Sequence, residues 1–191
     1  MGSKLILVVC NGNVHRSVVA QLCITRELQR RSIDGIACVS RGLQGTAGTA
    51  LPQGRNLRDY PREWSLTKPV LDRLGIEIPV TQQSMPVDRA VVEQARVIFA
   101  MDSGVLLQRS NSLVNQFSDQ RHKMRLLGEL TRRHQDIPDC FGSDSADLHE
   151  VVNHSIHRII EKGFDELLHW VSCDTKQESS LDLVHFYRDW P

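Results

Sequence analysis

The segment Lys4-Leu-Ile-Leu-Val-Val-Cys10-Asn-Gly-Asn-Val-His-Arg16-Ser17 sets the architecture of this chain, because an apolar run ends there in a cysteine, a turn and a helix start. The apolar run predicts a buried strand of a parallel sheet. Gly12 and Asn13 are residue types that can adopt positive φ, so the chain can curl tightly after this strand. From Arg16 to Arg31 apolar side chains recur four residues apart, which predicts a helix.

The turn between this strand and this helix predicts an anion-binding site. Backbone N–H groups of a tight turn and a helix start converge on a small volume and favour negative charge there. The same field favours a thiolate at Cys10, which would be nucleophilic at neutral pH. Arg16 is close enough to place its planar fork on an oxyanion. The pattern predicts phosphoryl transfer through a cysteinyl-phosphate; the alternative is a buried strand-end cysteine beside an unrelated helix.

Residues 8–17 resemble the signature of the low-molecular-weight protein tyrosine phosphatases, which is Cys, five residues, Arg, then Ser or Thr, close to the N-terminus. The resemblance implies that Cys10 is the nucleophile and that Arg16 binds phosphate and stabilises the transition state. It implies that Ser17 hydrogen-bonds the thiolate and that Asn13 holds the loop in its strained shape. The implied phosphate-binding loop is Asn11, Gly12, Asn13, Val14, His15, Arg16 and Ser17.

A cysteinyl-phosphate mechanism needs a proton donor for the leaving oxygen, and Asp139 is the candidate. It lies in Ile137-Pro-Asp-Cys-Phe-Gly142, just before the last predicted helix, where the resembled family places its general acid. Cys140 stands where the family has a proline, so the loop should be less rigid and the rate lower. The alternative is that Asp139 is only a turn residue.

The rest of the chain alternates predicted strands and helices, which indicates an α/β fold with a four-stranded parallel sheet flanked by helices, flavodoxin-like as the resemblance implies. We expect a phosphatase domain over residues 1–173 and a C-terminal tail over 174–191, of which 181–190 is apolar enough to pack somewhere. The predicted strands are 4–10, 36–40, 97–101 and 124–127. The predicted helices are 16–31, 65–74 with a start nearer 68, 87–95, and a long amphipathic one near 148–171.

Two expectations concern support around the phosphate loop. The resemblance implies that Ser40, at the end of the second strand, hydrogen-bonds Asn13; a serine that merely ends a strand is the alternative. The family's histidine after the Gly-Ile turn is replaced by residues 81–83, Thr-Gln-Gln, and its asparagine after the third strand is absent. We therefore expect other residues to support the phosphate loop in this chain.

Residues 43–64 are rich in turn formers and predict a long loop that could form a wall or lid over the site. Tyr60 or Trp64 could then stack on a substrate ring. The alternative is that both aromatic side chains hold the loop against the body of the protein.

The composition gives the chain no global charge bias, since 23 Lys and Arg residues balance 23 Asp and Glu residues. We therefore expect neither nucleic acid nor a membrane as partner, and the sequence leaves the oligomeric state open. The N-terminal apolar run is too short for a signal segment or a membrane span. Five cysteines form no C-x-x-C pair, which favours a reduced, cytoplasmic protein.

No metal or other cofactor is expected, because Arg16 and the backbone amides supply the positive field. Three histidines of the long helix, His149, His154 and His157, raise the alternative of a metal site. They lack a Cys or carboxylate spacing that would complete one, so a solvated polar face is favoured.

The resulting hypothesis is a phosphatase acting on a phosphotyrosine-containing protein substrate. In the resembled family the residue two before the arginine bears on substrate choice, and the aliphatic Val14 favours phosphotyrosine over phosphoarginine. Arsenate reduction is one alternative, but residues 75–105 contain no cysteine for the relay it needs. A phosphate-binding adaptor with weak or lost catalysis is the other.

Overall fold

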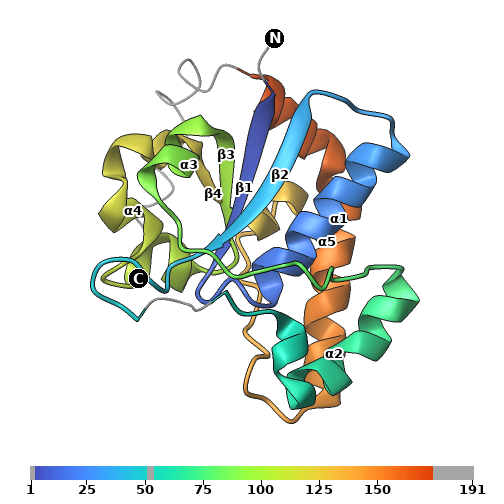
Figure 1. The fold of residues 1–191 in the computed structure, drawn as a ribbon. Coiled ribbons are helices and arrows are strands. Elements are labelled where there is room, and N and C mark those ends of the chain that lie inside the picture. Colours follow the sequence, from blue (N-terminus) through green and yellow to red (C-terminus); the bar gives the residue numbers. More distant parts are fainter. Residues whose placement is uncertain (1–2, 51–53, 174–191) are drawn as a thin grey trace.

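A computed structural model describes residues 3–50 and 54–173. The expected tail, with the apolar segment 181–190, lies outside the described residues. The fold is α/β, as predicted, and is built on one sheet of four parallel strands (Figure 1). The strands are β1 (Lys4–Cys10), β2 (Ile36–Gly42), β3 (Ala95–Ala100) and β4 (Met124–Leu126), in the spatial order β2-β1-β3-β4. This is the doubly wound order in which ligands bind at the carboxyl ends of the strands.

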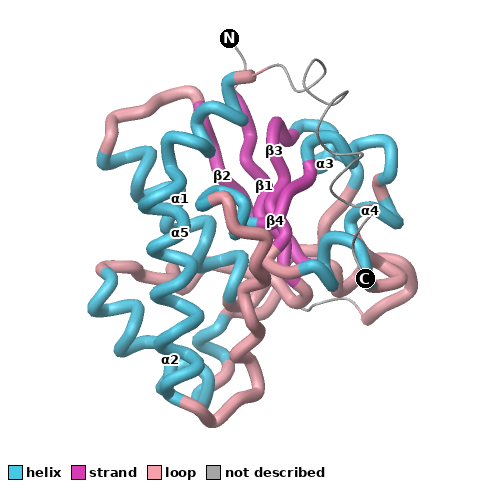
Figure 2. Tube along the Cα trace, turned by 180° about the vertical axis from the view of Figure 1, so that it is seen from behind, coloured by secondary structure: helices cyan, strands magenta, loops and turns pink. Residues whose placement is uncertain are grey.

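Helices cover both faces of the sheet (Figures 1 and 2). One face carries α1 (Arg16–Arg30) and α5 (Ala146–Ser172), and α2 (Pro61–Leu74) packs against the lower part of α5. The other face carries α3 (Arg89–Gln94) and α4 (Leu113–Gln116), with the π-helical turn η2 (Gly104–Gln108). No helix within the described ranges has the length and apolarity needed to cross a membrane.

The alternation along β1 explains the two layers. Ile6 and Val8 contribute to the core beneath α1 and α5, and Leu7 and Val9 contribute to the core on the opposite face. All four side chains are fully buried. A strand buried on both faces needs a continuous apolar sequence, which is why residues 5–9 carry no polar side chain.

The second helix begins earlier than predicted, at Pro61 rather than near residue 68. Pro61 occupies the first helical position, where a missing N–H costs nothing and the fixed φ suits the helix. Pro69 lies inside the helix and is exposed, so its ring points to solvent. Burial of Thr67, Val70 and Leu71 on the opposite side holds this turn in place despite the lost backbone hydrogen bond.

Candidate active site

The expected site lies at the carboxyl end of β1, where the chain turns into α1. Asn13 has φ of 52°, the left-handed conformation that was predicted, whereas Gly12 does not adopt positive φ. The turn lies directly against the end of β2. A Cβ atom at Gly42 would be 3.0 Å from Asn13 N and from the backbone oxygen of Asn11, so a side chain there would push the turn away.

Two hydrogen bonds reach the Cys10 sulfur, and a third joins the residues that make them. Ser17 Oγ is 3.0 Å from Cys10 Sγ, and the Asn13 backbone N–H donates to the same sulfur at 3.2 Å. Asn13 Nδ2 donates to Ser17 Oγ at 3.0 Å, which leaves the hydroxyl hydrogen of Ser17 free to point at the sulfur. Two hydrogen bonds thus converge on one sulfur atom.

The expected hydrogen bond between Ser40 and Asn13 is not formed. The Ser40 hydroxyl is buried and has no hydrogen-bond partner among the residues that the structure describes. Asn13 already uses both ends of its amide, because its Oδ1 accepts from the backbone N–H of Met85 at 2.8 Å while its Nδ2 binds Ser17. The loop is therefore supported by the backbone of the segment that pairs with Gly42.

Arg16 is buried and lies between two carboxylates. Its Nη1 donates to Asp102 Oδ2 at 2.6 Å and to the Ile137 carbonyl at 2.8 Å, and its Nη2 donates to Asp139 Oδ2 at 2.6 Å. Burial alone would lower the pKa of Arg16, but the negative charges of Cys10, Asp139 and Asp102 together raise it above its ordinary value. A permanently charged fork is thus held at the floor of the site.

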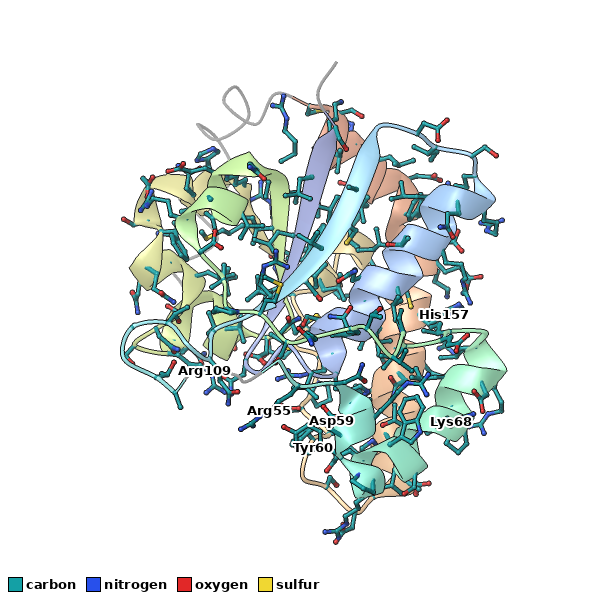
Figure 3. All side chains as sticks on the ribbon, viewed as in Figure 1. Arg55, Asp59, Tyr60, Lys68, Arg109 and His157 are labelled. Atoms are coloured by element: carbon teal, nitrogen blue, oxygen red, sulfur yellow. The ribbon has the colours of Figure 1, made fainter. Side chains whose placement is uncertain are left out.

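These groups line one small pocket with two kinds of wall. The phosphate loop, Arg16 and Asp139 form the polar floor, and residues distant in the sequence form the rim: Gln44, Arg55, Tyr60 and Phe141. Arg55 and Tyr60 lie together below the carboxyl ends of the strands (Figure 3). The rings of Tyr60 and Phe141 meet edge to face with centroids 4.9 Å apart.

The segment 43–64 therefore supplies part of the pocket wall, but only one of its two aromatic residues reaches the pocket. Trp64 packs against the core instead, and the Arg58 guanidinium lies 4.5 Å above the centre of its ring.

The His15 ring lies behind the loop and is 3% exposed. Its Nε2 is 3.0 Å from Asn153 Oδ1 of α5, and its Nδ1 is 3.2 Å from Cys140 Sγ. Since Asn153 Nδ2 donates to the His149 carbonyl, its Oδ1 accepts, and the His15 proton is assigned to Nε2. Burial lowers the pKa of His15 to about 4 and raises the pKa of Cys140 to about 12, so Cys140 is a thiol that donates to His15 Nδ1.

The sequence profile described as low molecular weight phosphotyrosine protein phosphatase matches residues 5–177. The chain belongs to this family. It is a protein phosphatase, a hydrolase of the cysteine-dependent kind.

Several solved structures share this fold. A YwlE mutant from Bacillus subtilis is 24% identical, with a TM-score of 0.68 over 87% of this chain and 99% of the other. The YwlE arginine phosphatase from Geobacillus stearothermophilus is 22% identical, with a TM-score of 0.66 over 87% and 94%. Vibrio vulnificus Wzb in complex with benzylphosphonate is 19% identical, with a TM-score of 0.66 over 86% and 99%. Comparison with curated protein sequences finds no significant match.

In this phosphatase, sequence reasoning placed the phosphate loop and Asp139 together but missed several partners. Asp102 was not predicted as a site residue, although an aspartate that directly follows the third strand lies at the same edge of the sheet as Arg16. The prediction of a solvated histidine face was wrong for His149, which is fully buried. No cluster of metal-ligating side chains occurs within the described ranges.

Proposed function

We propose that this phosphatase hydrolyses phosphotyrosine in proteins through a cysteinyl-phosphate intermediate. The observation that carries the proposal is the convergence of Cys10, with its two hydrogen-bond donors, and the buried fork of Arg16 in one pocket that also contains Asp139. These are a nucleophile, an anion clamp and a proton donor, the three groups that phosphoryl transfer of this kind requires.

Entry of the substrate must change the partner of Asp139. Asp139 Oδ2 is bound to Arg16, and a carboxylate engaged in that ion pair is not available to give a proton to a leaving group. A phosphate dianion brings its own oxygens to Arg16, so we infer that it displaces Asp139. Asp102 keeps hold of the other Arg16 nitrogen and preserves the orientation of the fork.

The chemistry then runs in two steps. The Cys10 sulfur attacks phosphorus, the S–P bond forms, and the P–O bond breaks as Asp139 gives its proton to the phenolic oxygen. In the second step water attacks phosphorus, Asp139 takes one of its protons, and the S–P bond breaks to release phosphate and the thiolate. Ser17 would stabilise the departing thiolate through its hydroxyl hydrogen. The positive charge comes from Arg16 and backbone amides, so the proposal needs no metal.

The rim of the pocket favours an aryl phosphate. Tyr60 and Phe141 of the rim can pack against a phenol ring, and Val14 of the phosphate loop adds an aliphatic side chain. Arg55 of the same rim disfavours a second guanidinium by charge repulsion. Two of the similar structures are named arginine phosphatases, at 22–23% identity. That likeness shows the fold, so phosphoarginine is kept as an arm of the test. A thiolate nucleophile suits a reducing compartment, and we propose a cytoplasmic location.

The deciding experiment measures turnover of p-nitrophenyl phosphate, a phosphotyrosine peptide and phosphoarginine by wild type, Cys10→Ser and Asp139→Asn. We expect wild type to prefer phosphotyrosine, Cys10→Ser to be inactive, and Asp139→Asn to lose about 10²–10⁴-fold. Cys173→Ser, a cysteine outside the pocket, is the matched control and should keep full activity. Binding of phosphopeptide by an inactive wild type would instead support the adaptor, and thiol-dependent arsenate turnover would support the reductase.

A further inference from the structure

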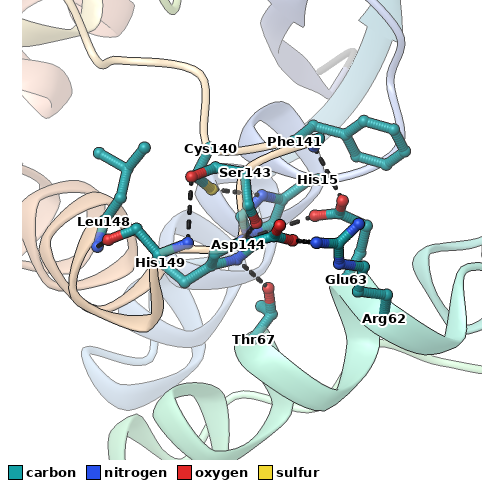
Figure 4. Close-up of polar contacts among 12 residues, drawn as sticks. His15, Arg62, Glu63, Thr67, Cys140, Phe141, Ser143, Asp144, Leu148 and His149 are labelled. Atoms are coloured by element: carbon teal, nitrogen blue, oxygen red, sulfur yellow. Dashed lines mark hydrogen bonds and ion pairs between the residues drawn. The ribbon is translucent and has the colours of Figure 1, made fainter.

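The backbone that follows Asp139 is held by side chains from three separate elements (Figure 4). We call residues 139–143 the acid loop. Cys140 contacts His15, which precedes α1, at 3.2 Å. Gly142 and Ser143 contact side chains of α2 and α5. Because Cys140 places no restraint of its own on φ, the shape of this loop depends on such contacts.

Glu63 of α2 holds the middle of the acid loop. The Gly142 backbone N–H donates to Glu63 Oε1 at 2.8 Å. The Glu63 side chain is buried, which is unusual for a glutamate and shows that this contact is built into the fold. Its other oxygen, Oε2, lies 3.5 Å from His149 Nε2 and has no hydrogen-bond partner of normal length within the described ranges.

His149 of α5 holds the end of the loop. Its Nε2 is 3.2 Å from the Ser143 carbonyl, and its Nδ1 is 2.8 Å from Thr67 Oγ1 of α2. Both groups near Nε2, a carbonyl and a carboxyl oxygen, are acceptors. The ring proton is therefore assigned to Nε2, from which it donates to Ser143, while Thr67 can donate to Nδ1.

The contact with Glu63 lies only a few residues along the backbone from Asp139. Asp139 Oδ1 accepts from the Phe141 backbone N–H at 3.2 Å, and Phe141 immediately precedes the Gly142 amide that Glu63 binds. Holding the Gly142 N–H thus restrains the neighbouring peptide between Cys140 and Phe141, whose N–H orients the Asp139 carboxyl. When phosphate takes over Arg16, this peptide becomes the remaining hydrogen-bond contact between Asp139 and the rest of the described chain.

We propose that Glu63 is a positioning residue for Asp139, with His149 as its partner, and that the pair sets how efficiently the leaving group is protonated. The proposal rests on the proposed function, in which Asp139 is the general acid. Glu63 does not line the pocket, and its hydrogen bond goes to the acid loop. A second route to the site runs through His149, whose ring stacks on that of His15 with centroids 6.1 Å apart, and the leaving-group dependence separates the two routes.

The test compares Glu63→Ala with wild type on aryl phosphates of graded leaving-group basicity, using kcat/KM, which reports on the first chemical step. For phenyl phosphate, whose leaving group needs a proton, we expect a loss of about tenfold or more, within the range that general acid catalysis supplies. For 2,4-dinitrophenyl phosphate, whose leaving group departs without a proton, the change should be less than about twofold. Glu63→Gln keeps an acceptor for the Gly142 N–H and should lose less than Glu63→Ala.

A double-mutant cycle with Asp139→Asn separates positioning from general damage. Once the acid is gone, Glu63→Ala should cause no further loss on phenyl phosphate. Arg62→Ala is the matched control, because Arg62 neighbours Glu63 on α2 and pairs with Asp144 beside the same loop, but both side chains are exposed. It should leave the leaving-group dependence unchanged.

Each result has a defined meaning. An equal loss for all leaving groups, or a loss that adds to that of Asp139→Asn, would overturn the positioning role while leaving the phosphatase intact. Failure of wild type to hydrolyse any aryl phosphate would instead overturn the proposed function. If Glu63→Ala does not fold, as judged by circular dichroism, Glu63→Met takes its place, because it fills similar space but offers no oxygen to the Gly142 N–H. It must then show the steeper leaving-group dependence, absent in the Asp139→Asn background.

Discussion

Among single residues, Arg16 connects the start of α1 to two segments that are distant in the sequence. It is buried, ion-paired to Asp102 and Asp139, and hydrogen-bonded to a backbone carbonyl. A planar fork can keep Asp102 with one nitrogen and offer the other to phosphate, which a single ammonium group cannot do. Its charge is not the only property that matters; the geometry of its donors matters as much.

The first prediction follows from that geometry. Arg16→Lys keeps the charge but loses the two-pronged donor geometry of the guanidinium. We expect kcat/KM for p-nitrophenyl phosphate to fall about 10²–10³-fold, the loss typical of removing one hydrogen-bond donor to a transition-state oxyanion. Steady-state kinetics measures the loss. Arg73→Lys, at an exposed ion pair with Glu150, is the control and should be near wild type. Activity of Arg16→Lys within threefold of wild type would contradict the role of the fork.

His15 gives a prediction about pH. Its pKa falls from an ordinary 6.5 to about 4 on burial, so the unfolded chain binds the extra proton more readily than the folded chain between these values. Because the folded chain resists protonation of His15, the contribution of this residue to the free energy of unfolding is greatest above pH 6.5. That contribution falls as the pH decreases towards 4, by on the order of 3 kcal/mol at most. Urea unfolding from pH 4 to 7 should show this slope in wild type and a smaller one in His15→Gln. Equal slopes would argue against a buried neutral imidazole.

At the scale of elements, α5 does more than cover the sheet. It delivers Asn153 to His15 and His149 to the acid loop, so its position along its own axis affects the site. That position depends on a close approach to the turn η4 (Leu127–Thr131) at Gly163. A Cβ atom at Gly163 would lie 2.5 Å from both Cβ and the carbonyl oxygen of Leu130.

Gly163→Ala should therefore destabilise the protein although alanine favours helices. Overpacking costs about 1–3 kcal/mol and here meets backbone atoms that cannot rotate away, whereas the propensity gain is about 1 kcal/mol. We expect a net loss of up to about 2 kcal/mol in the free energy of unfolding, measured in urea. Lys162→Ala, an exposed neighbour on the same helix, should change stability by less than about 0.5 kcal/mol. A Gly163→Ala protein more stable than wild type would disprove the close approach.

For the molecule as a whole, the site is an assembly of segments far apart in the chain. The phosphate loop, the rim residues of 44–60, Asp102 and the acid loop meet only because the carboxyl ends of β1 and β3 share one edge of the sheet. An anion that binds this assembly binds the folded chain and not the unfolded one, so binding and folding are coupled.

Inorganic phosphate should accordingly stabilise the whole fold. At a concentration 100 times its dissociation constant it should add about 2.7 kcal/mol to the free energy of unfolding, seen as a higher Tm. Arg16→Met should lose most of this gain. Chloride at matched ionic strength is the control, and an equal stabilisation by chloride would show a general salt effect instead.

At β1 and the phosphate loop, the predictions came from local sequence patterns. The apolar run, the left-handed Asn13 and the Cys–Arg spacing are all features of neighbouring residues, so their consequences could be read without the fold. The start of α2 was predicted wrongly for the opposite reason. A proline inside a helix is locally unfavourable, and only packing of the opposite face against the rest of the protein outweighs it.

The chain's order of residues was enough to predict a parallel α/β fold and the tight turn that follows Cys10, because each depends on periodicity or spacing over a few residues. The proposal that Asp139 is the acid came from the family resemblance. Only the packed structure shows that the Met85 backbone, rather than Ser40, hydrogen-bonds Asn13, and that Asp102 pairs with Arg16. It also shows that the buried Glu63 and His149 contact the acid loop. Each of these last contacts joins residues dozens of positions apart. Whether such polar groups meet depends on how helices and strands pack, which no local pattern encodes.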